Sequence, residues 1–206
     1  MSMISTTLAT LLTMTASEMP SYEPGTAFIY TGGRVETVVE NREDEVVWAT
    51  RGGREYVRAK NIALPITQWT IGDRTGERRY YGDPDGIWPP RPGARSRFRV
   101  VTDIDRDGEI SRSFQYWNCQ VGEAEPVELP NGEFDAMPIR CDRFSTNTMS
   151  FLERRTWWWS QDVGHYVRRE YRDLRDADVS EIRLCAVLPP RQASEARIEA
   201  LAEEGC

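Results

Sequence analysis

Short runs of β-branched and aromatic residues, separated by clusters of turn residues, recur along most of this chain. The clearest block extends from Glu125 to Glu170, where Pro130-Asn131-Gly132 and Asp162-Val163-Gly164 are the turn signals. Turn residues between such runs are typical of β-hairpins. The block therefore predicts consecutive strands over Val127–Leu129, Glu133–Arg143, Phe151–Ser160 and His165–Tyr171.

The same pattern upstream predicts an antiparallel meander. Its connections are too short for the crossover that parallel strands need, so consecutive strands must run in opposite directions. Residues Gly82–Ala94 are rich in Pro and Gly, and we expect them to cross between two halves of one sheet. The strands are expected at Thr26–Thr31, Arg34–Asn41, Glu45–Arg51, Arg54–Asn61, Ile66–Ile71, Glu77–Tyr81, Arg97–Ile104 and Glu109–Val121.

The C-terminal part predicts one more strand and a helix. Every second residue from Ile182 to Leu188 is apolar, which places a strand at Glu181–Leu188. Residues Gln192–Glu204 predict a short helix with Ser194 as its N-cap. Roughly ten strands and this helix predict a mainly β fold, a single strongly curved antiparallel sheet that forms an incomplete barrel. Such a sheet leaves a concave face that something must cover.

We place this β-sheet domain at residues 21–206 and expect residues 1–20 to lie outside it. Met3–Ala16 has a short apolar centre and is followed by Ser17, which makes a small-residue cleavage site. A secretory signal normally starts with positive charge, whereas no Lys or Arg precedes Arg34. We therefore interpret residues 1–20 as a degraded or truncated signal, with a disordered lead as the alternative.

Charge and hydropathy exclude two classes of partner. The 206 residues carry a net charge of −7, so a nucleic-acid partner has no electrostatic basis. No run approaches the roughly 18 apolar residues that a membrane helix needs, so we expect a chain that does not span a membrane.

The cysteines favour an oxidising compartment. They form no CxxC pair and His165 is the only histidine, so no zinc ligand set is recognisable. A hairpin about Pro130-Asn131-Gly132 places Cys119 and Cys141 within about two or three residues of opposite, an offset that a bulge absorbs. We predict disulfides Cys119–Cys141 and Cys185–Cys206. Four reduced cysteines in a cytosolic protein are the alternative.

The run Asp103-Ile104-Asp105-Arg106-Asp107-Gly108 matches the opening of a calcium loop, where alternate carboxylates converge on one ion. An EF-hand loop needs a bidentate Glu at its last position, which is Phe114 here, and its flanks are helices rather than strands. A hairpin with Asp107-Gly108 in a primed turn explains the same residues. We predict no metal or other cofactor, and leave cation binding by Asp103, Asp105 and Asp107 open.

No residue pattern indicates catalysis. His165 has no GxSxG-type elbow to serve, and carboxylate pairs such as Asp142 with Glu153 occur in any acidic β-protein. We assign no catalytic residues. Arg154-Arg155 and Arg168-Arg169 are expected to pair with Glu153, Glu170 and Asp173 across the sheet.

The tryptophans indicate a binding surface instead. Trp157 and Trp159 face one way on their strand, and Trp158 faces the other. A curved sheet lined with Trp and Tyr can hold an acyl chain or stack on a sugar, although Trp also simply fills the core of large sheets. We name Trp117, Trp157 and Trp159 as candidate ligand-binding residues.

The central block resembles a known group of proteins over residues 88–171. An extended turn of the Val-Pro-small-Gly-Thr-Phe type, a strand ending in Cys, an aromatic strand, a second turn and a basic strand follow one another. The chain thereby resembles largely uncharacterised bacterial envelope proteins whose curved-sheet fold is similar to the lipoprotein-localisation carriers (LolA/LolB-like). The resemblance implies a periplasmic or cell-envelope location and an apolar ligand in the concave face. The residues that carry it are Trp88-Pro89, Gly93, Phe98, Leu129–Phe134, Cys141, Trp157–Trp159, Gln161–Gly164 and Tyr166–Glu170.

These observations favour a non-enzymatic periplasmic protein that binds an apolar ligand, such as a lipid, or a hydrophobic segment of a partner in its concave face. The alternative is a structural or assembly subunit of an envelope complex, with the Arg-rich strands and the C-terminal helix as contact surfaces. A hydrolase acting through carboxylates is a third reading, which lacks a nucleophile and base.

Overall fold

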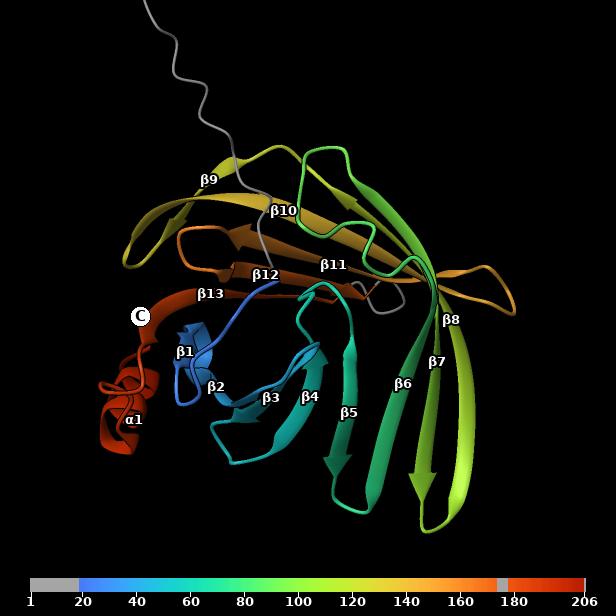
Figure 1. The fold of residues 1–206 in the computed structure, drawn as a ribbon, viewed down its shortest axis with the longest axis horizontal. Coiled ribbons are helices and arrows are strands. Elements are labelled where there is room, and N and C mark those ends of the chain that lie inside the picture. Colours follow the sequence, from blue (N-terminus) through green and yellow to red (C-terminus); the bar gives the residue numbers. More distant parts are fainter. Residues whose placement is uncertain (1–18, 174–177, 206) are drawn as a thin grey trace, which may run out of the picture.

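The computed structural model of the protein describes residues 19–173 and 178–205. In these residues, thirteen strands form one antiparallel sheet, and one α-helix follows the last strand (Figure 1). Among the described helices, none is both long and apolar enough to cross a membrane. The elements are β1 (Ala27–Tyr30), η1 (Thr31–Gly33, a 3₁₀ turn), β2 (Arg34–Asn41), β3 (Glu45–Thr50), β4 (Glu55–Ala59), β5 (Ile66–Ile71), β6 (Arg74–Gly82), β7 (Arg95–Arg106), β8 (Glu109–Val121), β9 (Glu125–Leu129), β10 (Gly132–Ser145), β11 (Phe151–Ser160), β12 (His165–Asp173), β13 (Val179–Leu188) and α1 (Glu195–Glu204).

The sheet closes on itself. β1 pairs with β2 on one side and with β13 on the other, so that Ala27 lies opposite Leu188. β10 pairs with both β8 and β11, which joins the N-terminal meander to the C-terminal strands. Twelve strands thus form a closed barrel, and β9 adds a short hairpin to the first part of β10.

The prediction of an incomplete barrel of about ten strands is therefore wrong, although its mainly β class and C-terminal helix are confirmed. The strand ranges expected for β2, β5, β8 and β11 agree with the structure to the residue. Closure depends on pairing between the first and last strands and on β10 passing β9 to reach β8. Neither contact is between chain neighbours, so no turn signal indicates it. Closure leaves these twelve strands without an unpaired edge.

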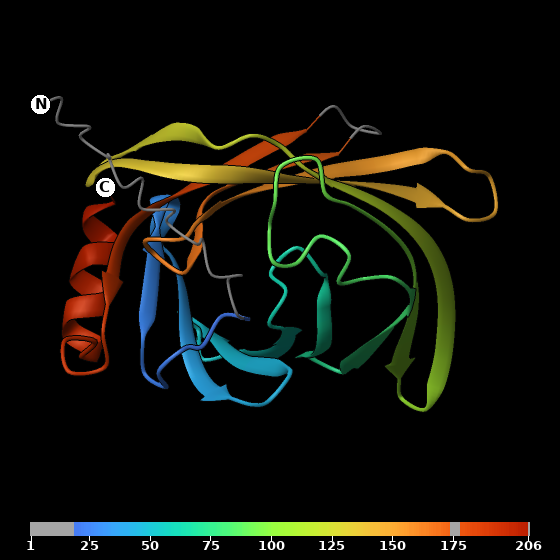
Figure 2. The ribbon, with the colours of Figure 1, turned by 45° about the horizontal axis from the view of Figure 1, so that its top comes forward.

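The Pro/Gly-rich loop Gly82–Ala94 closes part of the barrel interior instead of crossing between two half-sheets. It connects β6 and β7, which are paired neighbours, and it folds back over the barrel (Figure 2, green). Its Ile87 is fully buried, and the Trp88 ring meets the Trp159 ring edge-on at 4.8 Å. The loop between β4 and β5 contributes Ile62, which is 1% exposed, to the same core. Side chains from both loops therefore fill interior space.

Strand alternation sorts side chains onto an inner and an outer wall. On β7, the buried Phe98 and Val100 alternate with the exposed Arg97 and Arg99. The inner wall is strongly aromatic. Its largest fully buried side chains are Trp117, Trp157, Tyr30, Tyr166, Phe28 and Phe98.

Helix α1 lies against the outer wall beside β1 and β13. Ala202 is buried there, together with Ala27, Ile29 and Leu188 of the barrel, and Ile198 packs on the same cluster. Ser194 is the N-cap residue, as predicted, but the helix begins at Glu195, later than the expected Gln192. The apolar side of the helix is thus used within the chain.

Candidate functional site

The disulfide Cys119–Cys141 joins β8 to β10 on the inner wall. The two cysteines are direct register partners, without the predicted offset, because the Pro130-Asn131-Gly132 turn connects β9 to β10 rather than β8 to β10. With a sequence separation of 22, the bond stabilises the fold by about 3 kcal/mol in the chain-entropy model. The other predicted disulfide, Cys185–Cys206, falls outside the described residues because Cys206 does.

The three tryptophans predicted to bind a ligand lie together on the inner wall. Trp117, Trp157 and Trp159 are 1%, 0% and 3% exposed. The Trp117 ring stacks on Phe98 with 6.1 Å between centroids. The indole N–H groups of Trp117 and Trp157 have no hydrogen-bond partner in the described part of the chain. These side chains are core residues of the barrel, and their contact with an apolar ligand stays a prediction.

A buried polar cluster connects β2, β12 and the segment before β1. Glu36 accepts hydrogen bonds from the Tyr166 hydroxyl at 2.7 Å and from Arg34 Nη2 at 2.6 Å. Tyr22 Oη and His165 Nδ1 form a hydrogen bond of 2.8 Å. His165 Nε2 lies 3.9 Å from Glu36 Oε2, too far for a hydrogen bond.

Burial lowers the pKa of His165 below its usual value, although the neighbouring Glu36 acts against this shift. Burial by itself raises the pKa of Glu36, but the contact with His165 and the charges of Arg34, Arg58 and Arg169 hold it well below its usual value. The cluster thus places a neutral imidazole beside an ionised carboxylate. Both groups are at most 1% exposed, and the hydroxyl bonded to His165 belongs to a buried tyrosine. This geometry ties β2, β12 and the segment before β1 together within the barrel interior.

No pattern in the sequence singles out Glu36. On β2 the more apolar alternating set contains Val35, yet that side chain packs outward beneath α1. Arg34 and Glu36 belong to the other set, which points inward. Only the covering helix makes the outward set apolar, so alternation alone predicts the wrong face.

We expect the protein to lose stability as the pH falls below about 6.5, because the unfolded chain protonates His165 more readily than the folded protein. With a lowered folded pKa, this contribution is fully present above the unfolded pKa and is lost as the pH falls toward the folded value. The slope cannot exceed about 1.4 kcal/mol per pH unit. Denaturation between about pH 8 and pH 5 measures it. The variant His165→Gln lacks the only histidine and should flatten the curve; an unchanged slope contradicts the assignment.

A second group of inner-wall charges surrounds Glu153 on β11. Its carboxylate is ion-paired with Arg143 and lies 2.7 Å from Arg155 Nε, and the Tyr171 hydroxyl donates to it at 3.2 Å. Burial lowers the pKa of Arg155. The sequence offers Asp142 and Glu153 as a carboxylate pair, but Asp142 lies on the outer wall of β10. The two groups therefore cannot act on one substrate.

The aspartates of the calcium-like motif form the β7–β8 hairpin. Asp107 and Gly108 have φ angles of 54° and 85°, as a primed turn requires. Asp105 Oδ1 accepts the Gly108 N–H at 2.8 Å. Asp103 is ion-paired with Arg79 at 2.5 Å and with Arg112 at 2.6 Å. Among the described residues, no group of three or more His, Cys, Asp or Glu side chains is placed to hold a metal ion.

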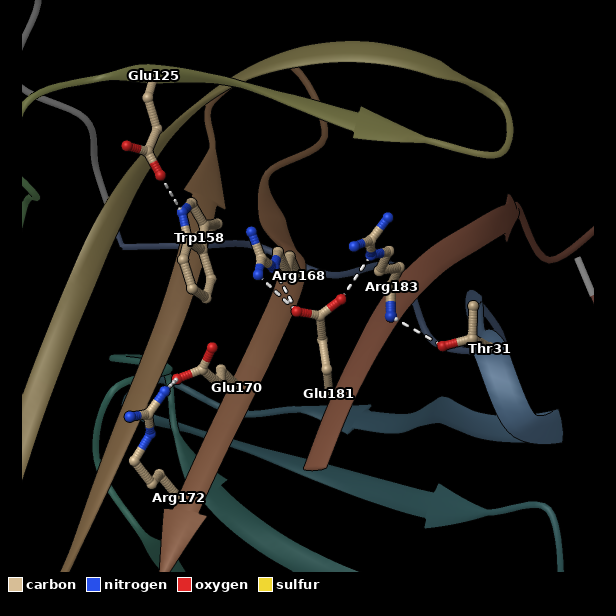
Figure 3. Close-up of polar contacts among 8 residues, drawn as sticks. All are labelled: Thr31, Glu125, Trp158, Arg168, Glu170, Arg172, Glu181 and Arg183. Carbon is tan, nitrogen blue, oxygen red and sulfur yellow. Dashed lines mark hydrogen bonds and ion pairs between the residues drawn. The ribbon is translucent and has the colours of Figure 1, made fainter. Parts of the chain in front are cut away.

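Arginines on the outer wall of β12 and β13 are paired with acidic residues (Figure 3). Glu181 lies between Arg168 and Arg183, with 2.5 Å to each. The Arg168 guanidinium also lies 4.2 Å from the centre of the Trp158 ring, whose N–H donates to Glu125 at 2.6 Å. Arg168 thus pairs with Glu181 and not with the expected Glu153, Glu170 or Asp173.

An apolar cleft of about 630 Å³ lies on the outer wall between β6–β8 and the β10–β11 hairpin. Thr146 Oγ1 donates to the Phe114 carbonyl at 3.1 Å, which fixes this hairpin against β8. The hairpin extends past β8 in both ribbon views (Figures 1 and 2). Three of the lining side chains, Tyr81, Phe114 and Met149, are 53%, 53% and 63% exposed. The cleft is lined by Tyr81, Arg99, Val101, Phe114, Tyr116, Thr146, Asn147 and Met149.

No pattern in the sequence indicates this cleft, because its residues come from β6, β7, β8 and the β10–β11 hairpin. A larger cleft of about 740 Å³ lies over β3–β7, but charged and amide side chains such as Glu55, Gln68 and Glu77 line much of it. The smaller cleft is therefore the better candidate for an apolar partner.

Solved structures share this architecture. A hypothetical lipoprotein, YmcC from Escherichia coli (K12), superposes with a TM-score of 0.52 at 10% identity, over 80% of this chain and 86% of that one. The chain has the YmcC-like fold. A putative exported protein with YmcC-like fold from Bacteroides fragilis gives a TM-score of 0.46 at 13% identity, over 84% of this chain and all of that one.

No protein-family model matches the sequence, and no curated protein matches it. The YmcC-like match confirms the predicted resemblance at the level of the fold, since identity is far below the range that carries function across. The candidate site of this YmcC-like barrel must therefore be argued from its own residues.

Proposed function

We propose that this chain is a non-enzymatic protein of the bacterial envelope that binds an apolar ligand, or a hydrophobic segment of a partner, in the external cleft. The observation that carries the proposal is the cleft itself, with Tyr81, Phe114 and Met149 each more than half exposed. Apolar side chains gathered in a concave surface are typical of binding sites. Inside the barrel, by contrast, the predicted ligand residues Trp117 and Trp157 are packed among core side chains.

Two observations support the envelope location. The YmcC structure that shares the fold is called a hypothetical lipoprotein. The disulfide Cys119–Cys141 is typical of proteins that fold in an oxidising compartment such as the periplasm. A binding role in place of catalysis is supported by the only histidine, which is fully buried against Tyr22 and Glu36.

Delipidated protein is expected to bind a fluorescent fatty acid at one site, which titration by fluorescence measures. Phe114→Ser should weaken binding about tenfold, because much of one aromatic side chain's apolar contact is lost. Ile71→Ser is the matched control, since Ile71 is 51% exposed but lies on β5 outside the cleft.

An equal loss in both variants, or no loss in Phe114→Ser, overturns the cleft as the site. Loss of binding in Trp157→Phe with normal binding in Phe114→Ser would place the ligand inside the barrel instead.

A further inference from the structure

We propose that the outer face of β7 and β8 docks on an anionic lipid bilayer, with the cleft and an adjoining row of arginines in contact with the lipid. This inference rests on the proposed function, because it names the partner of the same cleft.

Three arginines follow one another on the outer wall of β7, at every second residue. Arg95, Arg97 and Arg99 are exposed, and none of them has an ion-pair partner in the described part of the chain. Arg140 on β10 is in register with Arg95 through Gln120, and it is exposed and unpaired within the same residues. These four residues are called the arginine row. On β7 the row spans about 13 Å, since two residues of a strand advance about 6.6 Å.

Other exposed arginines of the described residues, such as Arg54 and Arg74, also lack an ion-pair partner, but the arginine row gathers four such residues on β7 and β10. Elsewhere on the outer wall, Arg79 and Arg112 share Asp103, and Arg168 and Arg183 share Glu181. A chain with 33 acidic and 26 basic residues has acids to spare. Even the nearby Asp142, which Asn118 connects to Arg97 in the register, is held by Arg154 at 2.7 Å.

The arginine row continues directly into the cleft. Arg99 lines the cleft and is flanked in register by Tyr81 on β6 and Tyr116 on β8. Phe114 and Met149 project beside it and are more than half exposed. One face of the barrel therefore presents unpaired guanidinium groups next to exposed aromatic and apolar side chains.

This combination fits the surface of an anionic membrane. Guanidinium groups bind lipid phosphates through paired hydrogen bonds, and aromatic side chains favour the boundary between headgroups and acyl chains. The net charge of −7 repels such a surface, so approach is favoured through a face that gathers unpaired arginines. A soluble polyanion would use the arginines but has no need of Phe114 or Met149.

Vesicle co-sedimentation of the full chain tests the proposal. Vesicles of phosphatidylcholine and phosphatidylglycerol in equal amounts should bind the protein at low salt, and vesicles of phosphatidylcholine alone should not. The triple variant Arg95→Gln, Arg97→Gln, Arg99→Gln should bind about a hundredfold more weakly, at about fivefold for each arginine near the surface. Phe114→Ser with Met149→Ser should also weaken binding, by a factor that stays the same at low and high salt because the lost contacts are apolar.

The matched control removes the same charge from paired arginines of the outer wall, as Arg168→Gln, Arg172→Gln, Arg183→Gln (Figure 3). This control should bind vesicles like the parent chain. If both triple variants bind vesicles equally weakly, the loss of binding follows from net charge alone, and the proposal is overturned. Binding to dextran sulfate that is as tight as binding to vesicles, and unchanged by Phe114→Ser, assigns the face to a polyanion and also overturns it.

Failure of this inference is distinguishable from failure of the proposed function. A protein that binds the fatty acid in the cleft but ignores anionic vesicles keeps the cleft as a ligand site and loses the membrane. Thermal unfolding of each variant confirms that the exposed substitutions leave the barrel folded.

Discussion

Replacing Trp157 by alanine is expected to lower the free energy of unfolding by about 3–5 kcal/mol. The Trp157 side chain on β11 points into the core and is 0% exposed to solvent. Its strand is held by ladders to β10 and β12, where Ile139 and Arg169 are its register partners. A wall paired on both sides cannot collapse into the space that the indole leaves, so the cost should reach the upper part of the range. Urea denaturation followed by fluorescence measures the loss.

The control for Trp157 is Phe114→Ala, at an aromatic residue that is 53% exposed on β8. This substitution should change stability by no more than about 0.5 kcal/mol. Equal effects of the two substitutions contradict the inner and outer assignment of these residues. The pair thus separates a residue needed for the barrel from a residue proposed for binding.

Replacing Glu36 by glutamine is expected to lower the free energy of unfolding by about 3 kcal/mol, because breaking a buried charge network leaves its cations uncompensated. Glu36 is 1% exposed and accepts hydrogen bonds from Arg34 and Tyr166. Arg58 is also buried and depends on the same negative charge. The value lies at the low end of the range for buried pairs because the Arg34 side chain is 40% exposed and partly solvated.

The control is Glu40→Gln on the same strand, where Glu40 and Arg42 form an exposed ion pair. It should leave the denaturation midpoint unchanged. Adding Arg58→Met to Glu36→Gln should restore part of the loss, and a double-mutant cycle measures the coupling. Additive losses in that cycle contradict a shared network.

The Glu36 substitution should also change the acid dependence of stability. The pKa of Glu36 is held below its usual 4.5, so its contribution is present above that pH and is lost as the pH falls toward the folded value. Glu36→Gln should therefore unfold with a shallower pH dependence below about 4.5. Glu40→Gln should keep most of the parent slope there.

Closure of the barrel removes the open concave face that was expected to bind a ligand. An incomplete barrel would offer its concave face, lined by Trp117, Trp157 and Trp159, whereas the closed barrel packs these residues in its core. Part of the inner wall is also ionic, as the contacts of Glu153 with Arg143 and Arg155 show. The external cleft, by contrast, gathers the exposed side chains of Tyr81, Phe114 and Met149 in a mainly apolar concave surface.

Local physics in the sequence determined most of the strands, the hairpin turns and the position of the helix. Alternation and turn residues act between neighbours in the chain, so β2, β5, β8 and β11 could be delimited without a structure. The turn at Asp107-Gly108 could be expected for the same reason. The Cys119–Cys141 bond was predicted correctly but from the wrong hairpin, because the pairing of β8 with β10 brings the two cysteines together.

Only the tertiary structure decided the closure, the facing of β2 and the candidate site. Ala27 meets Leu188 across almost the whole chain, and no local pattern encodes such a pair. Val35 points outward because α1 covers it, which reverses the face that its strand pattern favours. Tyr81, Phe114 and Met149 form one cleft only once β6, β8 and the β10–β11 hairpin lie side by side. Long-range contacts depend on the summed packing of the whole barrel, so residues far apart in sequence became a site through the fold alone.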